Sequence, residues 1–242
     1  MDRLPRFYIQ PNTRYVKKVI IDDDQVLHIR KSLRLEVGDP IIVFDGLQEK
    51  FLCELILITK KKVEARIIKN LELNIPHPEI TLIQSIPKSR KLDTIIKCLT
   101  EIGISKIIPI ETDFSIVKAK DIVKKYSRFY KIIIESCKQS ERDILLELEQ
   151  PQIFNYIKNL QNYDLKIIAS AKGNAENLKA ILNKSKNPLK IVYIIGPEGD
   201  FSQRELEIAR ESDFQHAIIS ENILRTETAA IYLGSILSFY FS

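Results

Sequence analysis

Residues 189–205 read LKIVYIIGPEGDFSQRE, an apolar run that ends at a glycine, turns through Pro-Glu-Gly-Asp and restarts at a serine. The run favours a buried strand, and Ser202 with Glu205 three residues later is typical of a capping box that begins a helix. A strand, a tight loop and a helix in this order form the unit of an α/β fold. The chain has 7 glycines, and two of them, Gly196 and Gly199, lie in this loop.

Other short apolar runs flank this unit after residue 75 and alternate with amphipathic segments. Near-continuous apolar strands that alternate with helices predict a parallel sheet covered on both faces. The first of the helices carries an apolar stripe from Leu92 to Ile102 and ends at Gly103. Strands are predicted over 79–86, 105–110, 165–171, 189–196 and 215–220, and further helices over about 121–139, 174–184 and 226–240.

The N-terminal part of the chain has a different pattern. Strands are predicted over 40–45, 50–58 and 62–69, with turns at Asp45-Gly46 and Thr59–Lys61, and a small barrel is the economical way to pack them. The stretch LNIPHP (73–78) contains two prolines that break both helices and strands. The sequence therefore predicts a small β domain over 1–74 and an α/β domain over 75–242.

Composition limits the class of protein. Hydrophobic residues make up 45% of the 242 residues and charged residues 29%, a balance typical of soluble globular proteins. The net charge of +5 arises in the first 150 residues, and this mild basic bias suits a polyanionic partner without requiring one. No apolar run approaches the ~20 residues of a membrane helix, and the N-terminus lacks a signal-peptide pattern. We therefore expect a cytoplasmic protein, and the scattered 3 cysteines and 3 histidines predict no metal site.

Three compact polar loops follow predicted strands, at 170–174, 196–201 and 220–226. In open α/β sheets, ligands bind beyond the carboxyl ends of the strands. A phosphate loop would need a Lys followed by Ser or Thr, or the pattern GxGxxG, and neither is present. Glu198 and Asp200 would also place two carboxylates beside a phosphate. The loops therefore favour a cationic ligand, or one held by main-chain groups.

The last loop begins ISENILRTETAA (219–230) and leads into the final helix. Thr226 or Thr228 is expected to cap that helix, and Glu227 suits the positive end of its dipole. Arg225 opposes the dipole at the same helix end. This unfavourable position makes Arg225 a candidate functional residue.

The two motifs IGPEGDFSQRE (195–205) and ILRTETA (223–229) together resemble the signature of the bacterial 16S ribosomal RNA uridine-N3 methyltransferases. That family belongs to the SPOUT superfamily of trefoil-knotted enzymes that use S-adenosyl-L-methionine. The resemblance extends over nearly the whole chain and includes PRFY (5–8), HIRKSLRLEVGD (28–39), TEIGISKIIP (100–109) and ESCKQSER (135–142). It implies a PUA-like barrel that binds RNA over 1–74, a knotted methyltransferase domain over 75–242, a homodimer and 16S rRNA of the small ribosomal subunit as substrate.

The resemblance also assigns roles. Arg225 would stabilise the negative charge on the target base, and Glu198 would orient the loop, attract the sulfonium or act as a base. RNA contacts would come from Arg6, Tyr8, Arg30 and Arg34, with Phe7 or Tyr8 stacking on a base. The residues implied to bind S-adenosyl-L-methionine are Ile195, Gly196, Pro197, Gly199, Ile219, Ser220, Asn222, Leu224, Thr226 and Ala229.

The chain departs from the family pattern at four positions. Asp200 and Ser220 replace glycines, Asn222 replaces an arginine, and Cys98 replaces a lysine. Aspartate tolerates a left-handed backbone, so we expect the turn at Asp200 to persist. Two other functions stay open at this point: a SPOUT methyltransferase for another RNA, such as a tRNA ribose, and a catalytically silent rRNA-binding assembly factor.

Overall fold

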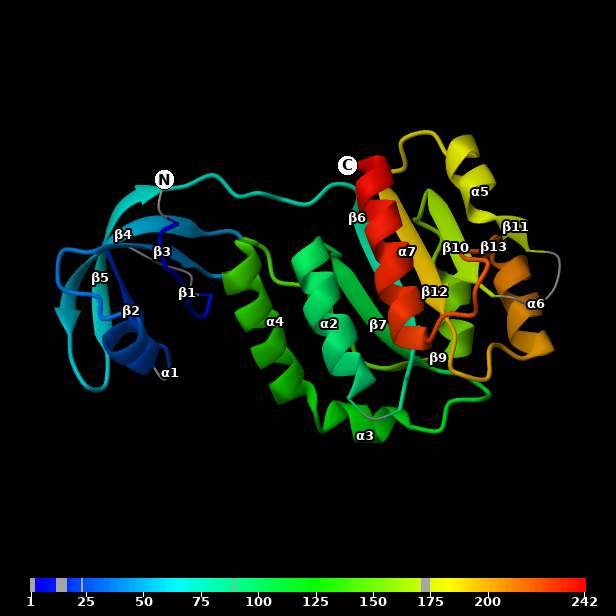
Figure 1. Ribbon diagram of the computed structural model, residues 1–242, viewed down its shortest axis with the longest axis horizontal. Helices are drawn as coiled ribbons and strands as arrows, with labels where there is room; N and C mark the ends of the chain where they lie inside the picture. Colours follow the sequence, from blue (N-terminus) through cyan, green and yellow to red (C-terminus); the bar gives the residue numbers. More distant parts are fainter. Residues whose placement is uncertain (1–2, 12–16, 23, 89, 171–174) are drawn as a thin grey trace. The chain divides into compact units, whose positions relative to one another are not determined.

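The computed structural model describes residues 3–11, 17–22, 24–88, 90–170 and 175–242. The chain forms two compact units (Figure 1). One contains Met1–Ile75 together with Ile134–Leu145, and the other contains Pro76–Ile133 together with Leu146–Ser242. The predicted fold class, a small β domain followed by an α/β domain, is confirmed. Residues 134–145, which the sequence predicted as part of the α/β domain, belong with the first unit.

A five-stranded sheet in the order β1-β3-β4-β5-β2 forms the first unit and curls around its core (Figure 1). Along β4, Phe51, Cys53 and Leu55 are buried at alternate positions, because successive side chains of a strand point to opposite faces. The three predicted strands are confirmed, whereas β1 and β2 were not predicted. The strands are β1 (Arg6–Tyr8), β2 (Lys18–Ile21), β3 (Pro40–Phe44), β4 (Lys50–Ile58) and β5 (Val63–Asn70), with α1 (Asp24–Leu27) and a π-helical turn (His28–Ser32) between β2 and β3.

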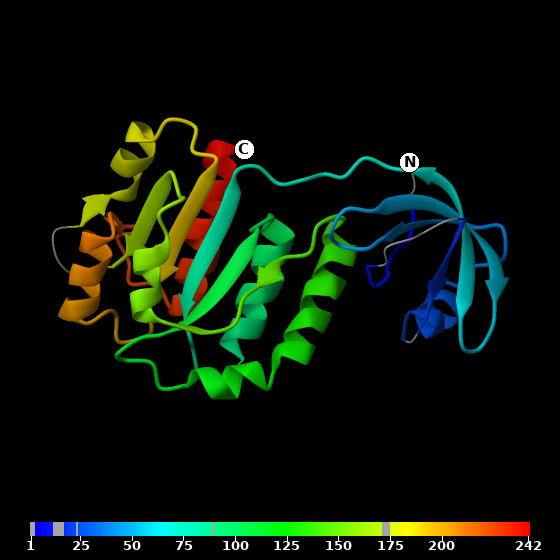
Figure 2. The same cartoon turned by 180° about the vertical axis from the view of Figure 1, so that it is seen from behind.

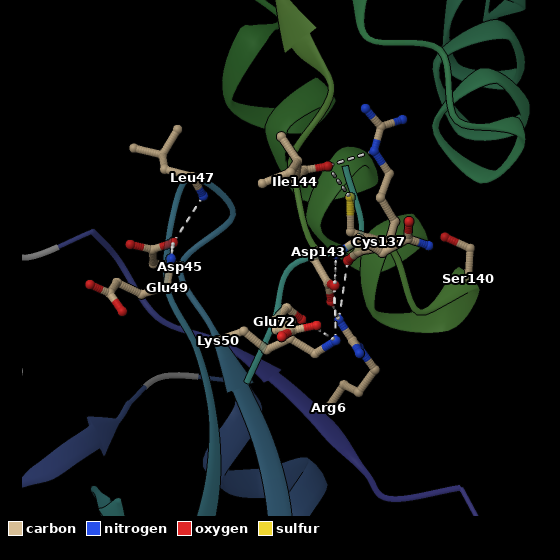
Figure 3. Close-up of polar contacts among 12 residues, drawn as sticks. Arg6, Asp45, Leu47, Glu49, Lys50, Glu72, Cys137, Ser140, Asp143 and Ile144 are labelled. Atoms are coloured by element: carbon tan, nitrogen blue, oxygen red, sulfur yellow. Dashed lines mark hydrogen bonds and ion pairs between the residues drawn. The ribbon is translucent and has the colours of Figure 1, made fainter. Parts of the chain in front are cut away.

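Asp143 attaches the segment 134–145 to the rest of the first unit. Its fully buried carboxylate accepts hydrogen bonds from Arg6 Nη2 at 2.6 Å, from Lys50 Nζ at 2.9 Å and from the main-chain N–H of Asn74 at 2.8 Å. Figure 3 shows the Asp143 carboxylate beside the Arg6 and Lys50 side chains. The buried Asp143 carboxylate therefore joins the segment 134–145 to β1, to β4 and to Asn74, which follows β5.

The predicted turn at Asp45-Gly46 is a second attachment point. Asp45 Oδ1 accepts main-chain hydrogen bonds from the three residues that begin at Leu47, and the Leu145 N–H donates to the Gly46 carbonyl at 2.8 Å. A Cβ on Gly46 would lie 2.3 Å from Leu145 Cγ, and Gly46 has a φ of 75°. Glycine is therefore required here both for its conformation and for the close approach of Leu145.

The second unit is built on a parallel sheet in the order β11-β13-β10-β12-β6-β7-β8, with β9 also paired to β7. β12, the strand of the opening motif, lies between β10 and β6. The predicted strands are confirmed, to within a few residues at their ends. The bounds are β6 (Glu79–Ser85), β7 (Lys106–Glu111), β8 (Glu147–Leu148), β9 (Gln152–Ile153), β10 (Leu165–Ala169), β11 (Glu176–Asn177), β12 (Lys190–Ile195) and β13 (Gln215–Ile218).

Helices cover both faces of this sheet (Figures 1 and 2). On one face α2 (Lys91–Ile102) packs beside α7 (Thr226–Phe241), and the buried Tyr193 hydroxyl of β12 donates to the Ala230 carbonyl at 3.0 Å. On the other face, Val192 and Ile194 of β12 pack into a core that includes residues of α6 (Gln203–Glu211) and of the 3-10 helix Phe154–Asn159. Burial on both sides explains why β12 is apolar along its length.

Two predicted helices differ from the structure. The segment 121–139 forms α3 (Ala119–Val123) and α4 (Tyr126–Ser140), separated by a tight turn. Of the segment 174–184, the structure describes residues 175–184, in which the helix is α5 (Leu178–Lys184). Gly103 ends α2 in a left-handed conformation, as predicted. The trefoil knot remains a prediction from the resemblance. In the described ranges, no helix is both long and apolar enough to cross a membrane.

Candidate active site

The carboxyl ends of β10, β12 and β13 lie at one edge of the parallel sheet. These strands are neighbours in the order β13-β10-β12 and run parallel, so their carboxyl ends meet at that edge. Of the predicted loop at 170–174, only Ser170 lies within the described residues. The other two predicted loops, 196–201 and 220–226, are described in full.

Asp200 shapes the loop after β12. Its N–H donates to the Pro197 carbonyl at 3.0 Å, and its φ of 61° is left-handed, so the expected turn is confirmed. Its carboxylate is engaged within the protein: Oδ1 accepts from the Phe201 N–H at 2.8 Å and Oδ2 from Ser170 Oγ at 3.2 Å. Asp200 therefore stabilises the turn and connects it to the end of β10.

The predicted capping box holds the other end of this loop. The Ser202 side chain accepts from the Glu205 N–H, and the Glu205 side chain accepts from the Ser202 N–H at 2.9 Å. The Glu205 side chain is fully buried and also accepts from the Asp113 N–H at 2.8 Å. Earlier in the loop, a Cβ on Gly196 would lie 3.0 Å from the Phe201 ring. The loop is therefore closely packed at both ends.

The expected threonine cap of α7 is wrong. Arg225 is the N-cap residue, without a side-chain capping bond, and Thr226 is the first helical residue. The buried Thr226 hydroxyl instead donates to the Gly196 carbonyl at 2.7 Å and accepts from the Gln84 Nε2 at 3.0 Å. Thr226 thus connects α7 to the ends of β12 and β6, a contact between distant segments that local capping patterns do not reveal.

Replacing Thr226 with valine should lower the free energy of unfolding by about 1–3 kcal/mol, because the buried Gln84 amide would keep only its hydrogen bond to the Ser85 carbonyl and the Gly196 carbonyl would lose the Thr226 hydroxyl. Gln84 Oε1 already has no hydrogen-bond partner among the described residues. Thr226→Ser, which keeps the hydroxyl, should retain most of the stability. Urea unfolding of the three proteins measures the difference, and equal stability of the valine and serine variants would contradict this role.

Lys91, the first residue of α2, contacts two acids at this edge. Its Nζ donates to Glu198 Oε1 at 2.7 Å and lies 3.2 Å from Glu227 Oε2. The hydrogen bond with Glu198 raises the pKa of Lys91. Partial burial acts to raise the pKa of Glu198, but its hydrogen bonds, above all that from Lys91, outweigh burial and hold this pKa below the usual value. Lys91 was not among the predicted site residues. The signal that could have found it is the one that identified Arg225, a cation at the N-terminus of a helix.

Arg225 is exposed at the same edge. Within the part of the chain that the structure describes, no hydrogen bond or ion pair engages its guanidinium. Its main-chain carbonyl accepts the first hydrogen bond of α7, from the Ala229 N–H at 2.8 Å. The backbone of Arg225 is therefore fixed while its charge is open to a ligand.

Family models and relatives agree with this geometry. A model described as RNA methyltransferase domain matches residues 74–238, and one described as RNA methyltransferase PUA domain matches residues 21–68. The chain is 31% identical over 224 residues to Ribosomal RNA small subunit methyltransferase E of Aquifex aeolicus, covering 90% of this chain and 93% of the relative. It is 30% identical to the Bacillus subtilis protein of the same name, covering 98% and 96%. The chain belongs to the ribosomal RNA small subunit methyltransferase E family.

Solved structures support the same membership. The family member from Neisseria gonorrhoeae, described as bound to S-adenosyl methionine, superposes with a TM-score of 0.85 at 28% identity and 98% coverage of both chains. A putative methyltransferase from Legionella pneumophila, described as in complex with the bound cofactor SAM, gives a TM-score of 0.87 at 28% identity, with 98% coverage of both chains. The predicted recognition of the family is confirmed.

In this member of the methyltransferase E family, the residues implied to bind the cofactor lie in two environments. Ile195, Pro197, Thr226 and Ala229 are buried and can offer only main-chain groups or packing. Gly199 and Asn222 are exposed, whereas Gly196, Ile219, Ser220 and Leu224 are half-buried, and the Ser220 hydroxyl accepts from the Asn222 N–H at 3.1 Å. All of them belong to the two loops, to the end of β12 or to the first turn of α7.

The four residues predicted to bind RNA differ in accessibility. Arg30 and Arg34 are exposed, and Arg34 has a left-handed backbone with a φ of 54°. Tyr8 is half-buried against Phe44, with ring centroids 5.9 Å apart. Arg6 needs correction: its side chain is 8% exposed, paired with Asp143 and packed over the Phe44 ring. Such a side chain has no face left for a phosphate, so Arg6 has a structural role, and the buried Phe7 cannot stack on RNA.

Proposed function

We propose that this chain transfers a methyl group from S-adenosyl-L-methionine to N3 of a uridine in 16S rRNA of the small ribosomal subunit. The observation that carries this proposal is the position of Arg225, whose guanidinium has no partner in the described ranges, at the edge where the acidic loop after β12 meets the first turn of α7. Membership of a family whose relatives are named for the small-subunit rRNA supports the substrate. That substrate places the reaction in the cytoplasm.

The groups around the loops fit this cofactor. Glu198, Asp200 and Glu227 place carboxylates at the edge, which suits a sulfonium cation and disfavours a phosphate. The Asp200 carboxylate accepts from the Ser170 hydroxyl and from the Phe201 N–H, so the acid that replaces a glycine is held within the protein. When bound, S-adenosyl-L-methionine supplies a methyl group activated by its positively charged sulfur. The main-chain groups of residues 195–199 and 219–224 would hold it.

Arg225 supplies the charge that the reaction needs. Uridine becomes nucleophilic at N3 when it loses its imide proton, and the resulting negative charge spreads over the two neighbouring carbonyl oxygens. A fixed guanidinium beside those oxygens stabilises this charge, and arginine stays protonated at all physiological pH values. Arg30 and Arg34 of the first unit would contact rRNA phosphates, which position the substrate without reading its sequence.

Titration calorimetry with S-adenosylhomocysteine tests the cofactor assignment on the purified protein. We expect saturable heat, whereas adenosine triphosphate should give none, because its phosphates would meet the carboxylates of the loop. Absence of heat at millimolar S-adenosylhomocysteine would contradict the proposal. The same result with retained rRNA affinity would instead favour a catalytically silent assembly factor.

We also propose that the protein is a homodimer that pairs through the outer face of α7. That face exposes large apolar side chains, with Tyr232 at 44% and Phe239 at 86%, around a hollow of about 640 Å³. Exposed apolar surface of this kind marks interaction sites. The hollow is lined by Thr94, Glu227, Thr228, Ile231, Tyr232, Ser235, Ile236 and Phe239.

Introducing charge on this face should separate the subunits. A variant with Tyr232→Glu and Phe239→Glu should elute as a monomer of 28.0 kDa in light-scattering chromatography, whereas the wild type should show twice that mass. Leu189→Glu is the matched control, because Leu189 is also exposed, at 72%, but directly precedes β12 and does not line the hollow. A monomeric wild type would contradict the dimer.

A further inference from the structure

Lys91 carries a positive charge at a helix end that, by itself, disfavours a cation. It is the first residue of α2, where the helix dipole repels a cation. Arg225 is the N-cap residue of α7, directly before its first helical residue, and the two helices pack side by side on one face of the sheet (Figure 1). Both helices begin at the edge where β6 and β12 end. Two cations therefore oppose two adjacent helix dipoles at the proposed active site.

The contacts of Lys91 join three separate segments. Its side chain is 26% exposed and reaches Glu198 of the loop after β12 at 2.7 Å and Glu227 of the first turn of α7 at 3.2 Å. The buried hydrogen bond from Thr226 to the Gly196 carbonyl joins the same loop to the same turn. The ion pairs of Lys91 and the hydrogen bond of Thr226 therefore both hold the loop after β12 against the first turn of α7, which begins directly after Arg225.

We propose that Lys91 is a positioning residue, which holds the Glu198 loop against the first turn of α7 and so fixes Arg225 relative to the bound cofactor. This inference rests on the proposed methyl transfer. It also selects one of the three roles open for Glu198: the carboxylate orients its loop through Lys91. Against the effect of partial burial, the hydrogen bond from Lys91 and the field of Lys91 and Lys88 lower the pKa of Glu198, which favours the ionised partner of an ion pair and makes the carboxylate a weaker base.

The geometry explains why the effect should appear in the rate. Lys91 has its contacts with protein carboxylates, so its removal takes away no direct contact that the structure assigns to the substrate. Loss of the ion pairs would allow the loop and α7 to shift against each other. A misplacement of about 1 Å lowers catalytic rates by up to about 100-fold, because reacting groups lose alignment.

Single-turnover methyl transfer to small subunits from a strain that lacks this protein tests the proposal. Lys91→Ala should react about 10- to 100-fold more slowly, while the dissociation constant of S-adenosylhomocysteine should rise by less than about 10-fold. Lys91→Arg should recover most of the rate, because it can still pair with both carboxylates. The melting temperature of Lys91→Ala should stay within about 4 °C of the wild type, because ion pairs of this exposure contribute little stability.

Lys158→Ala is the matched control, because it removes an exposed ion pair of 3.2 Å, with Glu211, that does not involve these loops. It should react at the wild-type rate. A double-mutant cycle gives the sharper result. Glu198→Gln should lower the rate of methyl transfer in the wild-type background but have little further effect in Lys91→Ala, because both changes break the ion pair between Lys91 and Glu198.

The outcomes separate the two proposals. If the wild type does not methylate the subunits, the proposed function is wrong, and this inference falls with it. If the wild type is active and Lys91→Ala reacts equally fast, the positioning role alone is wrong. It is also wrong if the effects of Lys91→Ala and Glu198→Gln multiply, or if Lys91→Arg is as slow as Lys91→Ala.

Discussion

Arg225→Ala should lower single-turnover methyl transfer by about 100- to 1,000-fold, the usual loss when one fixed stabiliser of a developing negative charge is removed. The expected loss follows from the position of the residue. Arg225 is exposed, opposes the dipole of α7, makes no side-chain capping bond and has no guanidinium partner among the described residues. A side chain with these properties adds little to folding, so the loss should fall on the reaction.

The melting temperature and a matched variant provide the controls for this prediction. The melting temperature of Arg225→Ala should equal that of the wild type or rise slightly, because an unfavourable cation leaves the helix N-terminus. Arg210→Ala is the matched control, because it removes an exposed arginine of α6 that pairs with Glu207. A wild-type rate for Arg225→Ala on assembled small subunits would show that this arginine does not take part in catalysis.

Asp143→Ala should destabilise the first unit by about 3–5 kcal/mol, because it would leave the Arg6 and Lys50 cations without the carboxylate that pairs with both. The Arg6 and Lys50 side chains are 8% and 18% exposed, and the Asn74 N–H would also lose its acceptor. Arg6 Nε already lacks a partner among the described residues. Without Asp143, Arg6 Nη2 would keep the Arg142 carbonyl at 3.2 Å and Lys50 Nζ the Glu72 carbonyl at 3.4 Å, and neither acceptor carries a negative charge. Hydrogen exchange of the amides in β3 and β4 measures the change.

Acid should have the same effect as the substitution. Burial acts to raise the pKa of Asp143, but hydrogen bonds from Asn74, Lys50 and Arg6 outweigh it and hold the pKa below the usual range. The carboxylate therefore contributes its full stability above the pKa of an unfolded aspartate, about 3.9, and loses it as the pH falls through the lower folded value. Asp121→Ala, at an exposed aspartate of α3, is the control. Unchanged exchange in Asp143→Ala would contradict the role of this cluster.

The parts of the fold that follow from local pattern were predictable. Apolar runs located the strands of the parallel sheet because burial on both faces leaves a continuous signal in the sequence. The capping box at Ser202 and the left-handed turn at Asp200 depend on neighbouring residues, so the residue types alone predict them. The resemblance named the family, which no periodicity would have provided.

The parts that depend on distant residues were not predictable. Lys91 and Glu198 are 107 positions apart, and Arg6 and Asp143 are 137 apart, so no local pattern connects them. The resemblance and the basic N-terminal region predicted Arg6 as an RNA contact, whereas Asp143, from a distant segment of the chain, pairs with its side chain. Threonine is a residue type that often caps helices, but the Thr226 hydroxyl instead bonds to Gly196 and Gln84 of other segments. In each case a tertiary partner competes with the local preference.

Mapping of methylated uridines in 16S rRNA, with and without this protein, tests the central claim most directly. A methyl group on N3 blocks the Watson–Crick face of the base, so reverse transcription stops at the modified nucleotide. We expect one stop in 16S rRNA to disappear when the gene is deleted, to return with the wild-type protein and to stay absent with Arg225→Ala. An unchanged 16S profile, with a methyl group missing from a tRNA instead, would contradict the claim.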